Sequence, residues 1–302
     1  MLRRKILKKL YFTTLIVFIL FIVSSFTINK NISNIKVEHQ TNLGTVYLLD
    51  DNNYLLEVNM TVSNNLMDSV AMVINNLKED NKHYSGLKGL LPSNTKINSI
   101  NIKDGIITID FNESVLNVNE KLEEKVIESI VYSLLSFKEI KGVIITINGE
   151  KLELLPKSMI KLDAILTKDF GINKDYNINS LNDIERVVLY YYEEKNSVNY
   201  YVPVTRYINS RDDKIKIIID NLKNSYLSKT NLMSYLNEKI KIENYEKKGN
   251  TVSLNFENVI DFTNEEIKEE VIYVIANSIF DSTDAVKVIF LSNDNIISIK
   301  TK

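Results

Sequence analysis

The sequence contains no cysteine among its 302 residues. A disulfide framework, a cysteine zinc site and thiol catalysis are therefore excluded, as is lipid attachment through a cysteine. Histidine is almost as scarce, since only His39 and His83 occur, both in polar connecting stretches. A Ser-His-Asp triad or a histidine metal site would have to use one of them. We expect both to be solvated loop residues.

Glycine is also rare, with eight residues, and no Gly-rich phosphate-binding pattern is present. Carboxylates do cluster, at Asp50-Asp51, Glu123-Glu124 and Glu265-Glu266-Glu269-Glu270. A turn explains the first cluster, and the dipole at the start of a helix explains the others. We therefore predict a protein that is not an enzyme, with no catalytic, cofactor-binding or metal-binding residues.

A basic surface is missing from the body of the chain. Five of the 37 Lys and Arg residues precede the first apolar run, which leaves 32 basic against 39 acidic residues, a net charge of −7. Binding to phosphate backbones needs a basic face, so nucleic acid is not expected as a partner.

The only long hydrophobic run lies at the N-terminus. Residues 10–28 carry no charge and, as a helix, are long enough to cross a bilayer. The basic residues before it favour a cytoplasmic N-terminus and an extracytoplasmic body. We expect residues 1–28 to form a basic tip and an uncleaved, single-pass transmembrane anchor in the cell membrane. A cleaved signal peptide is the competing interpretation.

One order of predicted elements, β-β-α-β-β-α-β, occurs twice. The first copy comprises residues 45–49, 55–60, 66–77, 97–102, 106–111, 120–137 and 143–147. The second copy comprises residues 187–191, 200–204, 215–222, 240–245, 251–256, 264–280 and 286–291. This order predicts an α+β fold of two tandem two-layer modules, each a mixed or antiparallel sheet with helices on one face.

The repeat also sets the expected boundaries. Residues 29–43 form a polar stalk, 44–152 the first module and 185–302 the second. Residues 153–184 form a linker, in which Met159, Leu162, Ile165 and Leu166 suggest a short helix.

The first copy resembles the GerM domain of endospore-forming bacteria. The residues that carry the resemblance are Leu87-Lys88-Gly89-Leu90-Leu91-Pro92, Thr95-Lys96-Ile97, residues 103–111, Ile130-Val131-Tyr132-Ser133-Leu134 and residues 142–149. The second copy is divergent, because Tyr235-Leu236-Asn237 replaces the Leu-Pro step and the Asp-Gly turn is missing. The GerM module is itself similar to ring-building folds.

The resemblance implies a scaffold in bacterial sporulation and spore germination. Its partners would be other envelope and sporulation membrane proteins, and assembly into homo- or hetero-oligomers stays open. The alternative is an envelope protein that binds or hydrolyses cell-wall peptidoglycan, which would need two acidic residues across a groove.

Six tyrosines gather on one predicted hairpin, at Tyr190, Tyr191, Tyr192, Tyr200, Tyr201 and Tyr207. Successive strand residues point to opposite faces, and a two-layer module buries only one of them. Some of these rings should therefore be exposed. Cross-strand aromatic packing with no partner is the simplest interpretation. A partner surface is the alternative, since tyrosine is favoured at interfaces, and glycan stacking is a third.

Overall fold

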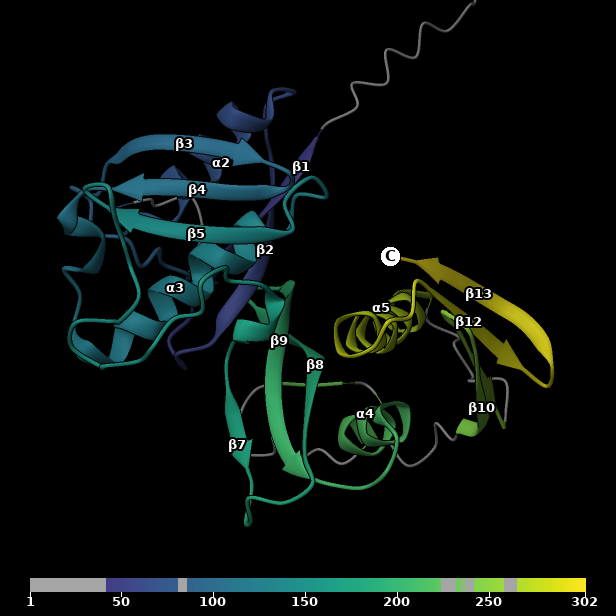
Figure 1. Cartoon of the computed structure of the whole chain (residues 1–302). Helices are drawn as coiled ribbons and strands as arrows, with labels where there is room; N and C mark the ends of the chain where they lie inside the picture. The colour runs from purple at the N-terminus through teal and green to yellow at the C-terminus, as the bar shows by residue number, and fades with distance from the viewer. Residues whose placement is uncertain (1–41, 81–85, 224–231, 235, 237–241, 258–264) are drawn as a thin grey trace, which may run out of the picture. The chain divides into compact units, whose positions relative to one another are not determined.

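The two halves of the chain fold into the same order of strands and helices, as the repeat predicts (Figure 1). The first module contains β1 (Leu43–Leu49), β2 (Leu55–Thr61), α2 (Leu66–Asn76), β3 (Ile97–Lys103), β4 (Ile106–Phe111), α3 (Glu120–Leu134), β5 (Gly142–Ile147) and β6 (Glu150–Lys151). The second contains β8 (Ile184–Lys195), β9 (Val198–Asn209), α4 (Lys214–Lys223), β10 (Ile242–Lys248), β11 (Thr251–Phe256), α5 (Glu265–Ser282), β12 (Lys287–Ser292) and β13 (Asn295–Thr301).

The computed structural model describes residues 42–80, 86–223, 232–234, 236, 242–257 and 265–302. The predicted anchor lies outside these residues, as do His39, His83 and the predicted stalk up to residue 41. Leu43, the last residue of that stalk, begins β1. Among the helices that are described, none is both long enough and apolar enough to cross a membrane.

Each module contains a mixed four-stranded sheet, which confirms the predicted combination of strands and helices. The sheets run in the order β3-β4-β5-β6 and β10-β11-β12-β13. In the first, β3 and β4 are antiparallel and turn at Asp104 and Gly105, both with positive φ, as in the favoured two-residue hairpin turn. β4 and β5 are parallel, so the chain must cross over between them, and α3 forms that crossover.

The first hairpin of each module does not pair with the four-stranded sheet of that module. It pairs with the first hairpin of the other module instead. Strands β1, β2, β9 and β8, with the short β7 (Asp175–Asn177), make a five-stranded sheet shared by both modules. The prediction of one sheet per module, covered by helices on one face, is therefore wrong for the hairpins. The reason is that β1 and β8 are apolar on both faces, with residues 46–49 and 187–193 all buried. Such strands require cover on both sides.

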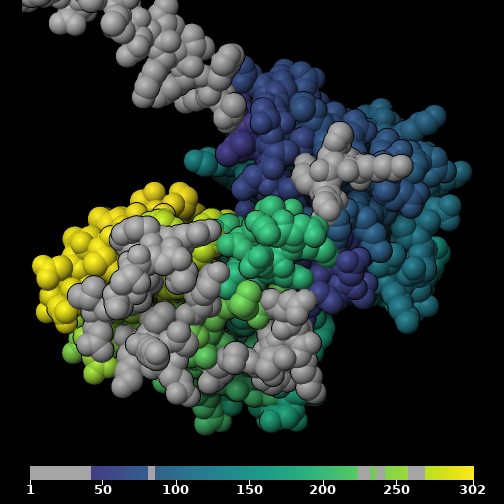
Figure 2. Space-filling model, turned by 180° about the vertical axis from the view of Figure 1, so that it is seen from behind, coloured from purple at the N-terminus to yellow at the C-terminus, as the bar shows by residue number. Residues whose placement is uncertain are grey.

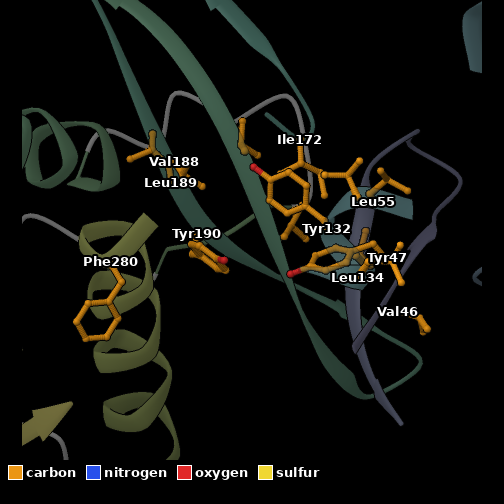
Figure 3. Packing of buried hydrophobic residues seen from close by; sticks show 14 of the residues in the cluster. Val46, Tyr47, Leu55, Tyr132, Leu134, Ile172, Val188, Leu189, Tyr190 and Phe280 are labelled. Carbon is orange, nitrogen blue, oxygen red and sulfur yellow. The ribbon is translucent and has the colours of Figure 1, made fainter. Parts of the chain in front are cut away.

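One continuous hydrophobic core runs through both modules. It includes Val46 and Leu134 from the first module and Val188 and Phe290 from the second. Close to the shared sheet, Tyr47 and Tyr132 lie near Tyr190 of β8 (Figure 3). The two modules are therefore packed as one unit.

Residues 153–184 are a structured part of this unit rather than a separate linker. Residues 159–166 do not form the predicted helix: Met159 has a left-handed φ of 56°, and bridges join Leu154 to Lys161 and Val143 to Leu166. The segment contains only the 3-10 helix η2 (Lys168–Phe170) and β7. The green surface of the middle of the chain lies against the purple and blue surface of the first module (Figure 2).

Candidate functional site at the junction of the two modules

Strand β9 changes its neighbour halfway along. Near its start it pairs with β2 of the first module through one residue pair, Glu57 with Tyr201. Near its end it pairs with β7 through Asp175 and Arg206. Pro203 lies between these two pairings, and its carbonyl points away from β8 towards Asn173. The N–H and C=O of a strand residue point to the same side of the strand. The N–H that proline lacks would therefore have pointed into this gap, so the hydrogen bonds between β9 and β8 are unaffected.

Asn173 fills the gap between β2 and β9. Its amide nitrogen donates to the carbonyls of Leu55 (2.9 Å) and Pro203 (2.8 Å), and its amide oxygen accepts from the N–H of Leu55 (2.8 Å). The side chain thus replaces a peptide group of a missing strand. Its own backbone has a left-handed φ of 48°, a conformation that asparagine adopts more readily than most residues.

A buried charge network holds Asn173 in place. Its backbone N–H donates to the carboxylate of Glu128 at 3.0 Å, and Lys125 bonds both to Glu128 (3.1 Å) and to the Asn173 amide oxygen (2.8 Å). Glu128 is 1% exposed. Burial raises its pKa, and the neighbouring Lys125 and Lys174 oppose that rise.

The predicted tyrosine surface is mostly interior. Tyr190, Tyr191 and Tyr192 are 3%, 3% and 1% exposed, so the expectation that one face of this strand is open is wrong. The remaining three, Tyr200, Tyr201 and Tyr207, are half-buried. The prediction left one face of β8 without cover, whereas Tyr191 lies near Tyr54 of the first module and near Asp175 and Arg206. Burial raises the pKa of Tyr191 to about 12.

Two of these tyrosines contact the first module or the helix that reaches it. The ring of Tyr201 stacks on Tyr273 of α5, with centroids 3.8 Å apart, and the Tyr273 hydroxyl donates to Glu57 of β2 at 3.0 Å. Burial raises the pKa of Glu57, and the hydrogen bond from Tyr273 partly offsets it. The tyrosine cluster is therefore an interface, and the surface it contacts belongs to the same chain.

A further set of polar contacts at the junction involves Tyr190. Its hydroxyl donates to Asp281 of α5 at 2.7 Å, and Lys168 of η2 forms an ion pair with Asp281 at 2.8 Å. The carbonyl of Lys168 accepts a hydrogen bond from Tyr132 of α3 at 2.9 Å. This chain of contacts connects the long helices of both modules through η2.

Serine hydroxyls accept hydrogen bonds from backbone N–H groups of the two outer strands of the shared sheet, at equivalent positions in the two modules. Ser133 of α3 accepts the N–H of Tyr47 at 3.0 Å, and Ser278 of α5 accepts the N–H of Tyr190 at 2.8 Å. These backbone groups would otherwise be unpaired at an edge strand. The repeated spacing of Tyr and Ser in the two copies is a sequence signal that could have identified this contact.

Three of the carboxylates noted in the sequence, Glu123, Glu124 and Glu269, have structural partners. Glu123 is fully buried and accepts the N–H groups of Lys157 and Ser158. Glu124 pairs with Lys174, and Glu269 with Lys300. Within the described part of the chain, no three Asp, Glu or His side chains gather in a way that could hold a metal ion. Sequence reasoning missed Asn173, Glu57 and Asp281, because no local pattern distinguishes them from other polar residues.

Comparison with known proteins adds to this geometry. The model of the Germane family, described as "Sporulation and spore germination", matches residues 45–153 and 188–297. The spore germination protein GerM of Bacillus subtilis (strain 168) is 29% identical over 198 residues, which is 65% of this chain and 54% of that protein. The chain thus spans about half the length of this relative. The solved tandem GerMN domains of the sporulation protein GerM from Bacillus subtilis superpose with a TM-score of 0.73 and 25% identity, covering 84% of this chain and 92% of that one. The resemblance drawn from the sequence is confirmed for both copies.

Proposed function

Because this chain belongs to the Germane family of sporulation and spore germination proteins, we propose that it is a scaffold that binds other envelope proteins outside the cytoplasm. The role in sporulation and germination follows from its relatives. The scaffold role is supported by the way in which the two modules are joined. A shared sheet, a shared core and the Asn173 contacts fix the modules as one unit, so that each presents its own sheet in a constant orientation.

The sheet edges are the surfaces that we propose for docking. Among the described residues, β3, β10 and β13 each pair with a neighbouring strand on one side only. Such strands offer backbone donors and acceptors to a strand of another protein. β13 combines this edge with two exposed apolar side chains, Ile296 and Ile299. β10 carries charges instead, which discourages indiscriminate pairing.

Attachment to the membrane completes the proposal. It rests on the uncharged run of residues 10–28 and on the basic residues before it. The scaffold would then be tethered by a single span, with both modules on the extracytoplasmic side. A non-catalytic role is proposed on the same sequence grounds, the scarcity of histidine and the lack of cysteine.

The test is affinity capture of the tagged full chain from sporulating cells after brief crosslinking. We expect envelope proteins to be recovered with the unchanged chain and to be lost with Ile296→Lys/Ile299→Lys. Leu181→Lys is the matched control, because Leu181 is 89% exposed and lies on the loop between β7 and β8, outside the two four-stranded sheets. Recovery of wall fragments without a protein partner would contradict the scaffold and support the peptidoglycan alternative. Expression outside sporulation would indicate a general envelope role.

A further inference from the structure

Two carboxyl groups meet at the junction, one from each module. Asp50 directly follows β1 and Glu193 lies near the end of β8, at equivalent places in the repeat. Their side chains are close enough to share a hydrogen bond, and both residues are almost fully buried, at 1% and 3% exposed. One oxygen of each, Oδ2 of Asp50 and Oε2 of Glu193, has no hydrogen-bond partner.

The turn of the first hairpin holds Asp50 rigidly. Its Oδ1 accepts the N–H groups of Asn52 (2.9 Å) and Tyr54 (2.6 Å), so that Oδ2 is the oxygen left for Glu193. Asn52 also donates from its side chain to Glu193 at 3.4 Å. β8 extends to Lys195, which keeps Glu193 within the strand and fixes its direction. Neither carboxyl group can turn to solvent without opening the contact.

Nearby cations offset the negative charge of the Asp50–Glu193 pair only in part. Lys195 acts on Glu193 but forms its ion pair with the exposed Asp51, at 3.1 Å. Tyr54 of the first hairpin lies near the Asp50–Glu193 pair and also near a second ion pair, between Arg206 of β9 and Asp175 of β7. The two neighbouring ion pairs, Lys195 with Asp51 and Arg206 with Asp175, each carry no net charge. Two ionised carboxylates would leave a buried excess of negative charge.

We infer that the Asp50–Glu193 pair makes the contact between the modules sensitive to pH, because one shared proton joins the turn of the first hairpin to β8 and its loss loosens that contact. The direction follows from linkage. Burial first and the neighbouring Asp50 second raise the pKa of Glu193 in the folded chain. The stabilisation is thus complete below the pKa of an unfolded glutamate and is lost as the pH rises through the raised value. This response is independent of the partner that the modules bind.

The experiment compares the full chain with Glu193→Gln, which keeps the shape and removes the titration. Urea unfolding and hydrogen exchange of the β1–β2 turn are measured from pH 5 to pH 8. Glu57 and Glu128 also have raised pKa values, but they are present in both proteins and cancel in the difference. Asp51→Asn is the control, since Asp51 lies in the same turn and is exposed.

We expect the unfolding constant of the unchanged chain, relative to that of Glu193→Gln, to increase about twofold or more between pH 5 and pH 8. Asp51→Asn should keep the full pH response. A ratio that does not change with pH overturns the inference. A second measurement adds millimolar calcium or magnesium chloride at pH 8. If the salt stabilises the unchanged chain but not Glu193→Gln, the pair is a cation site and the inference is also overturned.

Discussion

The hydroxyl of Tyr273 donates a hydrogen bond of 3.0 Å to Oε1 of Glu57, which ties the last helix of the chain to its second strand. Glu57 is also the residue whose backbone pairs with Tyr201 of β9. One position of β2 therefore takes part in both the sheet and the side-chain contacts between the modules.

Removing this hydroxyl tests its importance. Tyr273→Phe keeps the ring stack on Tyr201 but leaves the buried Glu57 carboxyl with one donor fewer, and we expect a loss of about 1 to 3 kcal/mol in the free energy of unfolding. Glu57→Gln keeps an acceptor without the charge and should cost less at neutral pH. Urea denaturation measures both. Tyr176→Phe, at an exposed ring, is the control. Equal losses for Tyr273→Phe and Tyr176→Phe would show that the contact is unimportant.

Asn173 offers a second test. Asn173→Ala leaves the N–H and C=O of Leu55 and the C=O of Pro203 without their partner, and we expect a loss of about 3 kcal/mol or more. Asn173→Gly also removes the side-chain amide, but glycine adopts a left-handed φ without strain. Its loss of stability therefore reports the amide and not the backbone conformation. Asn53→Ala is the matched control, since Asn53 is an exposed asparagine with φ of 64°. If Asn173→Ala and Asn53→Ala cost the same, backbone strain and not the amide carries the effect.

The equivalent serines should behave alike. Ser133→Ala and Ser278→Ala each leave one strand N–H unpaired, and we expect each to cost about 1 to 3 kcal/mol. Hydrogen exchange should increase at Tyr47 in the first variant and at Tyr190 in the second. Ser99→Ala, at an exposed position of β3, serves as the reference. An unchanged exchange rate at either tyrosine would show that the serine does not protect it.

Asp110 should contribute to acid unfolding. Hydrogen bonds from Thr146, from the backbone of Gly149 and from Asn98 lower the pKa of its carboxyl group. Its contribution to stability is therefore present above the pKa of an unfolded aspartate and is lost as the pH falls through the lowered value.

Asp110→Asn tests that contribution, and the second module already has Asn255 at the equivalent place. We expect the variant to be less stable at neutral pH and less sensitive to pH below about 4. Thermal unfolding across this pH range is the measurement, with the exposed Asp163→Asn as the control. An acid response as steep as that of the unchanged chain would contradict the prediction.

Most strands and helices could be predicted because their apolar residues recur with the period of each element. The ends were harder to predict. The strand expected over residues 187–191 continues to Lys195, and the turn is formed by Asn196 and Ser197, both with positive φ. Strand β13 was missed because the predicted order of elements ended at 286–291 and none of the β13 residues is fully buried. Such boundaries depend on contacts that a single segment does not reveal.

The junction could not be predicted at all. A hairpin with two apolar faces is compatible with burial inside its own module or against another one, and the sequence does not distinguish them. Asn173 has no local pattern, since its three strand contacts are with residues 30 or more positions away. The tyrosine cluster did mark an interface, but only the topology identifies the other side as β2 and α5.

The shared sheet also determines how mechanical force passes through the molecule. A pull on the chain ahead of Asn42 loads β1 first, and seven residue pairs transfer that load to β2. From β2 the backbone route into the second module is the single pair of Glu57 with Tyr201, supported by the Asn173 amide. Under tension this pair offers little backbone hydrogen bonding, so the load between the modules falls on the shared core and on side-chain contacts such as that of Tyr273 with Glu57.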